Sequence, residues 1–379
     1  MGAARRAWAE VDLAAVRHNA SVLVGLAAPA GLCAVVKAGA YGHGSVAVAK
    51  AALAGGARWL AVAIVEEGAV LRDHGIEAPI LLLSEPPADA MDDVVALGLT
   101  PTLYTEPGVE AAAKAVASAV PLDAVPLDVH VKVDTGMHRV GAGAEEAIAV
   151  VRSVADRPEL RFGGLWTHFA VADDPANPFT GAQCARLDAV VAQLAAQDLR
   201  PPLVHACNSA GVLAHPSAHH DLVRCGIALY GVAPSPTLAA FHPVADLRPV
   251  LSLRAQVAYV REVAAGEAVS YGLRRSLERT SSVATVGVGY ADGVPWRLGV
   301  AGGEVLIGGC RRPLAGSVTM DQIMVDCGDD GGVLPGDEVV LIGRQGDEQI
   351  TAWDWATRVG TIAYEVLCGI GPRVPKVYG

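Results

Sequence analysis

The feature that most constrains the fold is an alternation of short, apolar, β-rich runs with alanine-rich segments of helical length, from about residue 12 to 235. This alternation is typical of parallel α/β proteins, because parallel strands need long crossovers that are usually helices. Counting eight strands favours a closed (β/α)8 TIM-like barrel over an open doubly wound sheet. The predicted strands cover 32–37, 59–63, 80–84, 100–104, 127–134, 162–169, 203–209 and 221–231.

After Pro234 the pattern changes, because strand-like runs are now separated by glycine and proline turns instead of helices. We therefore expect a mostly antiparallel β domain with strands in 254–263, 282–290, 303–309, 318–327 and 337–343. Two short helices should close the chain, with Thr351 and Thr361 as their caps. The predicted domains are a cofactor-binding barrel over 10–240 and a β domain over 241–379, which the N-terminal strand 1–9 should join.

Charge and cysteine usage narrow the class of protein. A net charge of -11 opposes nucleic-acid and acidic-membrane partners, so neither is expected. The seven scattered cysteines include no CxxC pair, and His215, His219 and His220 in HPSAHHD are interpreted as a solvated loop, so no metal site is predicted. Glu10 and Asp12 interrupt the start before an apolar run develops, which excludes an ordinary signal peptide. The expected location is the cytoplasm.

Polar side chains close five of the predicted strands. In a barrel these positions meet at the rim that carries catalytic groups, so they predict a cation-rich site for an anionic ligand. Lys37 can be read as an ordinary solvated lysine or as an amine that forms an imine with a carbonyl. The sequence contains no dinucleotide fingerprint, Walker A loop or GxSxG motif. The strand-end residues are Lys37, Lys132, Asp134, Arg139, His168, His205, Asn208, Ser209 and Arg224.

Phosphate can be held where a helix begins, because its first backbone N–H groups have no partner within the helix. Asn208 and Ser209 open the predicted helix SAGVLAH, and the backbone near Gly226 offers a second close approach. An ordinary helix cap explains Asn208 equally well. The spacing of the motifs is therefore compatible with a lysine that binds a phosphate-bearing cofactor. It does not identify the reaction.

Nine strings, in order, carry a resemblance to a known family over nearly the whole chain: AVVKAGAYGHG, KVDTGMHRVG, THFAVAD, HACNSAG, RCGIALYG, VSYG, VGYADG, VTMDQ and YEVLCGIGPRVP. Together they resemble the alanine racemase family of fold-type III pyridoxal-phosphate enzymes. The resemblance implies a barrel followed by a β domain, pyridoxal 5'-phosphate as cofactor, and a homodimer with shared active sites. It also implies interconversion of L- and D-alanine, which supplies D-alanine for peptidoglycan.

The resemblance assigns roles residue by residue. Lys37 resembles the cofactor-linked lysine and the base on one face of the substrate, and Tyr271 resembles the opposite-face base donated by the second subunit. Arg224 resembles the residue facing the pyridine nitrogen, with His205 as its orienting partner. The remaining implied cofactor contacts are Tyr41, His168, Asn208, Ser209, Gly226, Ile227 and Tyr364.

For the substrate, the resemblance implies that Arg139 and the Met320 backbone hold the carboxylate, with Asp321 beside them and Tyr290 in the entry region. Lys132 matches a lysine that is carbamylated in some members. Two departures bear on specificity: His138 stands where glycine is common, and Thr319 stands where cysteine is common. Strict preference for alanine is therefore less secure than racemisation itself.

Alternative functions remain open at this stage. They are a broader small-amino-acid racemase that also accepts serine, and a weakly active paralogue that binds alanine analogues. Decarboxylation of basic amino acids shares the fold, but VSYG and VTMDQ argue against it. Pyridoxal-phosphate carriers of a single domain lack the second domain expected here.

Overall fold

The computed structural model describes residues 7–119, 126–329 and 331–379. It contains two compact units. Among the described residues, one unit comprises 14–40, 45–119 and 126–248, and we call it the barrel unit. Within the described part of the chain, the other comprises 7–13, 41–44, 249–329 and 331–379, and we call it the β unit. The predicted domains of 10–240 and 241–379 treated each region as nearly continuous, whereas the β unit here is assembled from three segments.

Eight parallel strands form the core of the barrel unit, in agreement with the predicted fold class. They lie in two sheets ordered β4-β3-β2-β9 and β5-β6-β7-β8. A parallel bridge between Leu81 and Thr100 joins the sheets on one side, and hydrogen bonds from Asp221 to Val204 and from Arg224 to Cys207 join them on the other. The strands are β2 (Gly31–Val35), β3 (Trp59–Val62), β4 (Ile80–Leu82), β5 (Thr102–Leu103), β6 (Leu127–Lys132), β7 (Leu160–Trp166), β8 (Leu203–His205) and β9 (Leu222–Cys225).

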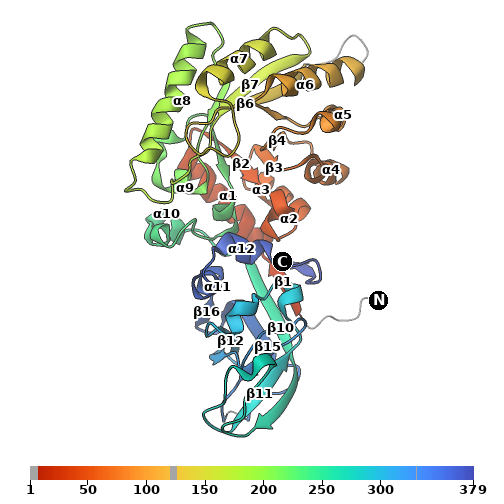
Figure 1. Ribbon diagram of the computed structural model, residues 1–379, viewed down its shortest axis with the longest axis vertical. Helices are drawn as coiled ribbons and strands as arrows, with labels where there is room; N and C mark the ends of the chain where they lie inside the picture. The colour runs from red at the N-terminus through yellow and green to blue at the C-terminus, as the bar shows by residue number, and fades with distance from the viewer. Residues whose placement is uncertain (1–6, 120–125, 330) are drawn as a thin grey trace. The chain divides into compact units, whose positions relative to one another are not determined.

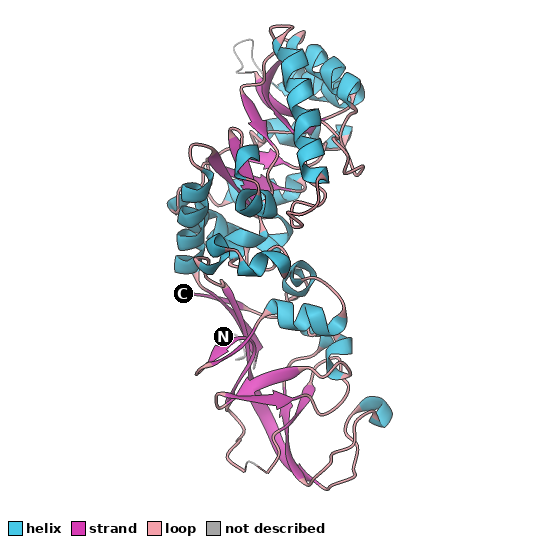
Figure 2. Ribbon diagram, turned by 90° about the vertical axis from the view of Figure 1, so that its left-hand side faces the viewer, coloured by secondary structure: helices cyan, strands magenta, loops and turns pink. Residues whose placement is uncertain are grey.

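Helices lie outside these strands, as both views show (Figures 1 and 2). Their apolar faces are buried; in α7, for example, Ile148, Val151 and Val154 are buried, with the spacing expected of one helix face. The helices are α1 (Leu13–Ala27), α3 (Ser45–Ala54), α4 (Val65–Asp73), α5 (Met91–Ala96), α6 (Glu106–Ala119), α7 (Ala144–Ala155), α8 (Phe179–Ala195), α9 (Ser209–Ala214) and α10 (His242–Ala245). The segment labelled α2 (Lys37–Tyr41) is a left-handed turn.

The β unit is built on one sheet in which every pairing is antiparallel except that between β1 and β17. Strand β1 pairs with β10, although more than two hundred residues separate them, and residues 1–6 of the predicted first strand lie outside the described residues. The elements are β1 (Ala7–Val11), β10 (Leu251–Val263), β11 (Ser281–Val286), β12 (Glu304–Ile307), β13 (Cys310–Pro313), β14 (Ile323–Asp326), β15 (Glu338–Gln345), β16 (Glu348–Ile350), α11 (Ala352–Val359), α12 (Ala363–Cys368) and β17 (Lys376–Tyr378).

Several predicted strands were too long. The strand predicted over 203–209 ends at His205, and the one predicted over 221–231 ends at Cys225, because a 3-10 helix occupies Ile227–Tyr230. Within 318–327 only Ile323–Asp326 forms a strand. Beyond His205 and Cys225 the apolar character continues because the following turns are buried as well, and hydropathy cannot distinguish a buried turn from a strand. In 318–327 the extra residues precede the strand, and Met320 is exposed.

The helix caps were predicted with mixed success. Thr351 caps α11 through a reciprocal pair of hydrogen bonds with Asp354. Thr361 was wrong as a cap, because α12 begins one residue later than required and the N-cap position is Ile362. The Thr361 hydroxyl instead donates to the Glu365 side chain. No helix among the described residues is long and apolar enough to cross a membrane.

Candidate active site

Cationic side chains gather at the carboxyl ends of the barrel strands. Burial lowers the pKa of His168 well below its ordinary value, and four cations within electrostatic range lower it further: Arg224, Arg139, Lys132 and Lys37. Because proximity of like charges is unfavourable, this arrangement is suited to an anionic ligand. The structure thus brings together the barrel-unit cations that the strand ends predicted.

Lys37 begins an unusual turn. The predicted strand over 32–37 ends at Val35, and the backbone after Lys37 is left-handed at Ala38, Gly39, Ala40 and Tyr41, with φ between 52° and 59°. A left-handed conformation costs an L-residue about 1–2 kcal/mol, so the surrounding structure must hold this turn in place.

Glu67 in α4 provides part of that restraint. Its two carboxylate oxygens accept hydrogen bonds from the backbone N–H of Ala38 and, at 2.8 Å, from that of Ala63. The carboxylate therefore ties the residue after Lys37 to the end of β3. The sequence reasoning missed Glu67, because nothing in VEEG distinguishes it from a solvated helix residue.

Arg224 is 2% exposed, and it pairs with no carboxylate among the described residues. Its Nη2 donates to the carbonyl oxygens of Thr167 and Ala206 at 2.7 and 3.0 Å and approaches His168 Nδ1 at 3.3 Å. Its Nη1 donates to His205 Nδ1 at 2.8 Å. Burial lowers the Arg224 pKa to about 10, so the group stays charged at neutral pH.

Trp166 contacts two cations. Lys132 Nζ is 4.2 Å and Arg224 Cζ 4.4 Å from the centre of its ring, distances typical of cation–π contacts. His205 stacks against the same indole at 5.6 Å with an angle of 8° between the planes. Trp166 was missed in the sequence, although its spacing of two from His168 could have suggested that both follow the same strand face.

Lys132 has a lowered pKa of about 7. Burial is the main cause, followed by the charges of Arg224 and Arg139, while Asp134 acts in the opposite direction. A substantial fraction of this amine is therefore neutral near pH 7.

Arg139 itself is exposed and follows a turn organised by Asp134. One Asp134 oxygen accepts the backbone N–H groups of Gly136, Met137 and His138 at 2.9–3.1 Å. Burial raises the Asp134 pKa, but these bonds and His138 outweigh it and leave the pKa below its ordinary value. His138 has φ +54°, a conformation that favours glycine, which gives a physical reason for glycine being common there.

Asn208 and Ser209 lie at the start of α9. Asn208 caps the helix by accepting the Gly211 N–H at 2.9 Å. The buried Ser209 hydroxyl accepts the backbone N–H groups of Gly226 and Ala228 at 3.0 and 3.2 Å, which leaves its own hydrogen to donate. In this structure the Gly226 N–H is therefore directed to Ser209.

Ile227 lies in the barrel unit, and the remaining predicted residues lie in the β unit. Tyr41 and Tyr364 have ring centres 6.3 Å apart. The Tyr290 N–H donates to the Thr319 carbonyl at 3.0 Å, and Gly289 is closely packed there, because an added Cβ would lie 2.4 Å from the Thr319 and Met320 carbonyl oxygens. This contact places the Tyr290 and Met320 segments side by side.

Tyr271 begins a 3-10 turn (Tyr271–Leu273) and is 76% exposed. Its carbonyl accepts the Ser317 hydroxyl at 2.8 Å, and a pocket of about 450 Å³ is lined by both Tyr271 and Thr319. Asp321 forms an ion pair with Arg373 at 2.7 Å.

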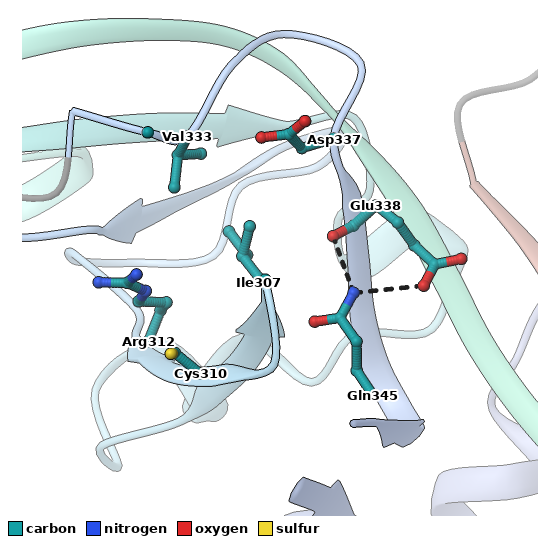
Figure 3. A pocket seen from close by; sticks show the side chains of 9 residues that line it. Ile307, Cys310, Arg312, Val333, Asp337, Glu338 and Gln345 are labelled. Carbon is teal, nitrogen blue, oxygen red and sulfur yellow. Dashed lines mark hydrogen bonds between the residues drawn. The ribbon is translucent and has the colours of Figure 1, made fainter. Parts of the chain in front are cut away.

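A further pocket of about 390 Å³ lies between strands of the β unit and contains none of the predicted residues (Figure 3). Two of its polar side chains, Gln345 and Glu338, bond to each other. Gln345 Nε2 donates to the Glu338 carbonyl and carboxylate at 3.3 and 3.2 Å, and Gln345 Oε1 accepts the Gly309 N–H at 2.9 Å. Among the described residues, no group of three or more His, Cys, Asp or Glu side chains has the arrangement of a metal site.

Comparison with known proteins decides the family. The model of the alanine racemase N-terminal domain matches residues 11–234, and that of the alanine racemase C-terminal domain matches residues 250–378. The chain belongs to the alanine racemase family. The alanine racemase of Symbiobacterium thermophilum is 46% identical, with 99% of this chain and 97% of the relative covered.

Solved alanine racemases have the same fold. The Streptomyces coelicolor enzyme is 40% identical with a TM-score of 0.92, and 98% of each chain is covered. The Bacillus anthracis enzyme with bound L-Ala-P is 37% identical with a TM-score of 0.91, covering 100% of this chain and 96% of the other. The resemblance inferred from nine motifs is therefore confirmed for family and fold.

Proposed function

We propose that this chain is a pyridoxal-phosphate-dependent alanine racemase that acts as a cytoplasmic homodimer. The observation that carries the proposal is the group of cations around His168, assembled by strand ends of a chain with a net charge of -11. Such local positive charge against an acidic background suits a phosphate and a carboxylate together. Its product D-alanine would supply peptidoglycan synthesis.

The residues present fit the cofactor. Lys37 supplies the amine for a covalent link, and Ser209 retains a hydroxyl hydrogen for phosphate, with Tyr41, Tyr364, Asn208, Gly226 and Ile227 as the further proposed contacts. All hydrogen bonds of Arg224 to described residues start from Nη1 and Nη2, so its Nε–H remains for an acceptor such as the pyridine nitrogen. When bound, the cofactor would delocalise the negative charge left at Cα after proton loss.

Inversion at Cα requires a proton to leave on one face and another to arrive on the opposite face. We assign the first position to Lys37 and the second to Tyr271 of a second copy of the chain. Tyr271, Leu273 and Met320 are 76%, 67% and 53% exposed, which supports a subunit contact at this part of the β unit. Arg224, charged at neutral pH, would keep the ring nitrogen unprotonated.

The substrate carboxylate is assigned to Arg139 and the Met320 backbone, with Asp321 and Tyr290 near the entry. Lys132 supports this assignment in two ways. Its amine is partly neutral near pH 7, as reaction with carbon dioxide requires, and Arg139 is close enough to affect its pKa. A carbamate on Lys132 would give Arg139 an anionic partner.

The test follows alanine in deuterated water. Purified protein loaded with pyridoxal phosphate is incubated with L-alanine, and both optical rotation and loss of the Cα proton are recorded. Deuterium incorporation with inversion supports racemisation by two bases. Exchange without inversion contradicts the two-base scheme, and no exchange favours a paralogue that only binds alanine analogues. L-serine in parallel measures the broader specificity that His138 and Thr319 leave open.

A further inference from the structure

We propose that His130 is a positioning residue for the candidate active site: its ring fixes the tautomer of His205, so that His205 Nδ1 remains the acceptor that orients Arg224. The inference rests on the proposed function only in taking Arg224 as a ligand-facing cation. His130 is in the middle of β6, away from the strand ends that define the rim.

A continuous line of hydrogen bonds links the three side chains. His130 Nδ1 is 2.9 Å from His205 Nε2, and His205 Nδ1 is 2.8 Å from Arg224 Nη1. All three residues are at most 2% exposed. Within this buried line each nitrogen must have a suitable role, because an unsatisfied polar atom there would cost stability.

The guanidinium sets the role of His205 Nδ1, and His130 supplies the acceptor that the opposite nitrogen, Nε2, then needs. Arginine has donors only, so His205 Nδ1 must accept. Neutral His205 then carries its hydrogen on Nε2 and donates it to His130 Nδ1. His130 consequently carries its own hydrogen on Nε2. A group at position 130 without an acceptor would leave the His205 Nε2–H unpaired and remove the bond that favours this tautomer.

Burial keeps both rings neutral. It lowers the His130 pKa to about 4; the Asp128 charge raises the pKa, and the Arg224 charge lowers it. Burial also lowers the His205 pKa well below its ordinary value, with further lowering by Arg224, His130 and His220. The protonated form of either ring would have two donors and could not accept from its neighbour.

The neighbouring strand carries glycines where the His130 ring lies against it. A Cβ added to Gly164 in β7 would lie 2.9, 3.0 and 3.1 Å from three ring atoms of His130, and one added to Gly163 would lie 3.2 and 3.3 Å from two. The β6–β7 register shifts between Val129 and His130, where Gly163 is the extra residue. The paired glycines in RFGGLW are thus explained by the position of the His130 ring.

Two substitutions separate positioning from packing. His130→Phe retains an aromatic ring and removes the acceptor, whereas His130→Asn removes the ring and retains an oxygen acceptor near the place of Nδ1. Positioning predicts that Asn preserves function and Phe does not, and packing predicts the reverse. Gly164→Ala should act like His130→Phe because it displaces the ring, and Gly181→Ala in α8 is the control, since no atom lies within 4 Å of its added Cβ.

Two readouts are taken on protein loaded with pyridoxal phosphate. Nitrogen NMR of histidine-labelled protein without substrate reports the His205 tautomer, and alanine kinetics report kcat and KM. We expect His130→Phe and Gly164→Ala to disturb the His205 signals. Both should also lower kcat about tenfold, because the loss of one hydrogen bond changes a free energy by an amount that corresponds to such a factor. KM should change less. His130→Asn and Gly181→Ala should retain the parental tautomer and kcat.

The inference is overturned if folded His130→Phe keeps the parental tautomer and kcat, or if folded His130→Asn loses both. Should His130→Phe fail to fold, His130→Asn and Gly164→Ala decide the question by themselves. Failure of the proposed function is a separate result, because the parental protein would then not racemise alanine, whereas the tautomer of His205 is measured without any turnover.

Discussion

Acidification should destabilise the barrel unit through His130. Burial lowers the His130 pKa from 6.5 to about 4. Between these two pH values, the unfolded chain binds a proton at His130 and the folded chain does not. Stability is therefore fully present above pH 6.5 and is lost as the pH falls toward 4. From about pH 7.5 to about pH 5, proton linkage through these two pKa values removes about 2 kcal/mol of unfolding free energy.

The assay compares the parental protein with His130→Asn, which has no titrating group at this position. Urea unfolding is followed by far-UV circular dichroism and by tryptophan fluorescence at both pH values, since coinciding curves are needed to compare free energies. Carboxylates and the other histidines titrate in both proteins, so the parent should lose about 2 kcal/mol more than the variant. Equal losses in the two proteins would refute the assignment of a buried, neutral His130.

Three other outcomes are expected. Tyr271→Phe should slow removal of the Cα proton from one alanine enantiomer far more than from the other, as measured by deuterium incorporation; equal, full exchange from both would contradict its role as a base. Because the neutral fraction of Lys132 increases as the pH rises through about 7, a carbamate signal in carbon-13 NMR with labelled bicarbonate should increase over the same range and be absent in Lys132→Ala. Thr351→Ala should lower stability by about 1 kcal/mol in urea unfolding through loss of its helix cap, whereas an unchanged midpoint would show that the cap contributes little.

Much of the architecture could be predicted from sequence, because its signals are local. Each barrel strand is a short apolar run followed by a helical segment, and the order of these elements is sufficient to predict a barrel. Strand ends were less well predicted: the 3-10 helix Ile227–Tyr230 is as buried and apolar as a strand. The strand pairing of the β unit was harder to predict, because β1 precedes the barrel in the sequence and pairs with β10, which follows it.

The residue types at the rim could also be predicted from the sequence, since each lysine, arginine or histidine that follows a predicted strand can be identified there. The surroundings of these side chains could not be predicted. The left-handed turn after Lys37 depends on restraints such as the Glu67 carboxylate, which comes from another element. Whether Arg224 is paired with a carboxylate could not be known before its carbonyl and imidazole partners were located.

His130 shows the difference between what the sequence determines and what only the tertiary structure determines. By itself, the sequence determined that residue 130 is a histidine on a predicted strand, two residues before Lys132. Only the tertiary structure placed it against His205, 75 residues away, and opposite glycines that accommodate its ring. The physical reason is that strand formation depends on neighbours along the chain, whereas proton positions and pKa values depend on burial and on partners that closure of the barrel brings together.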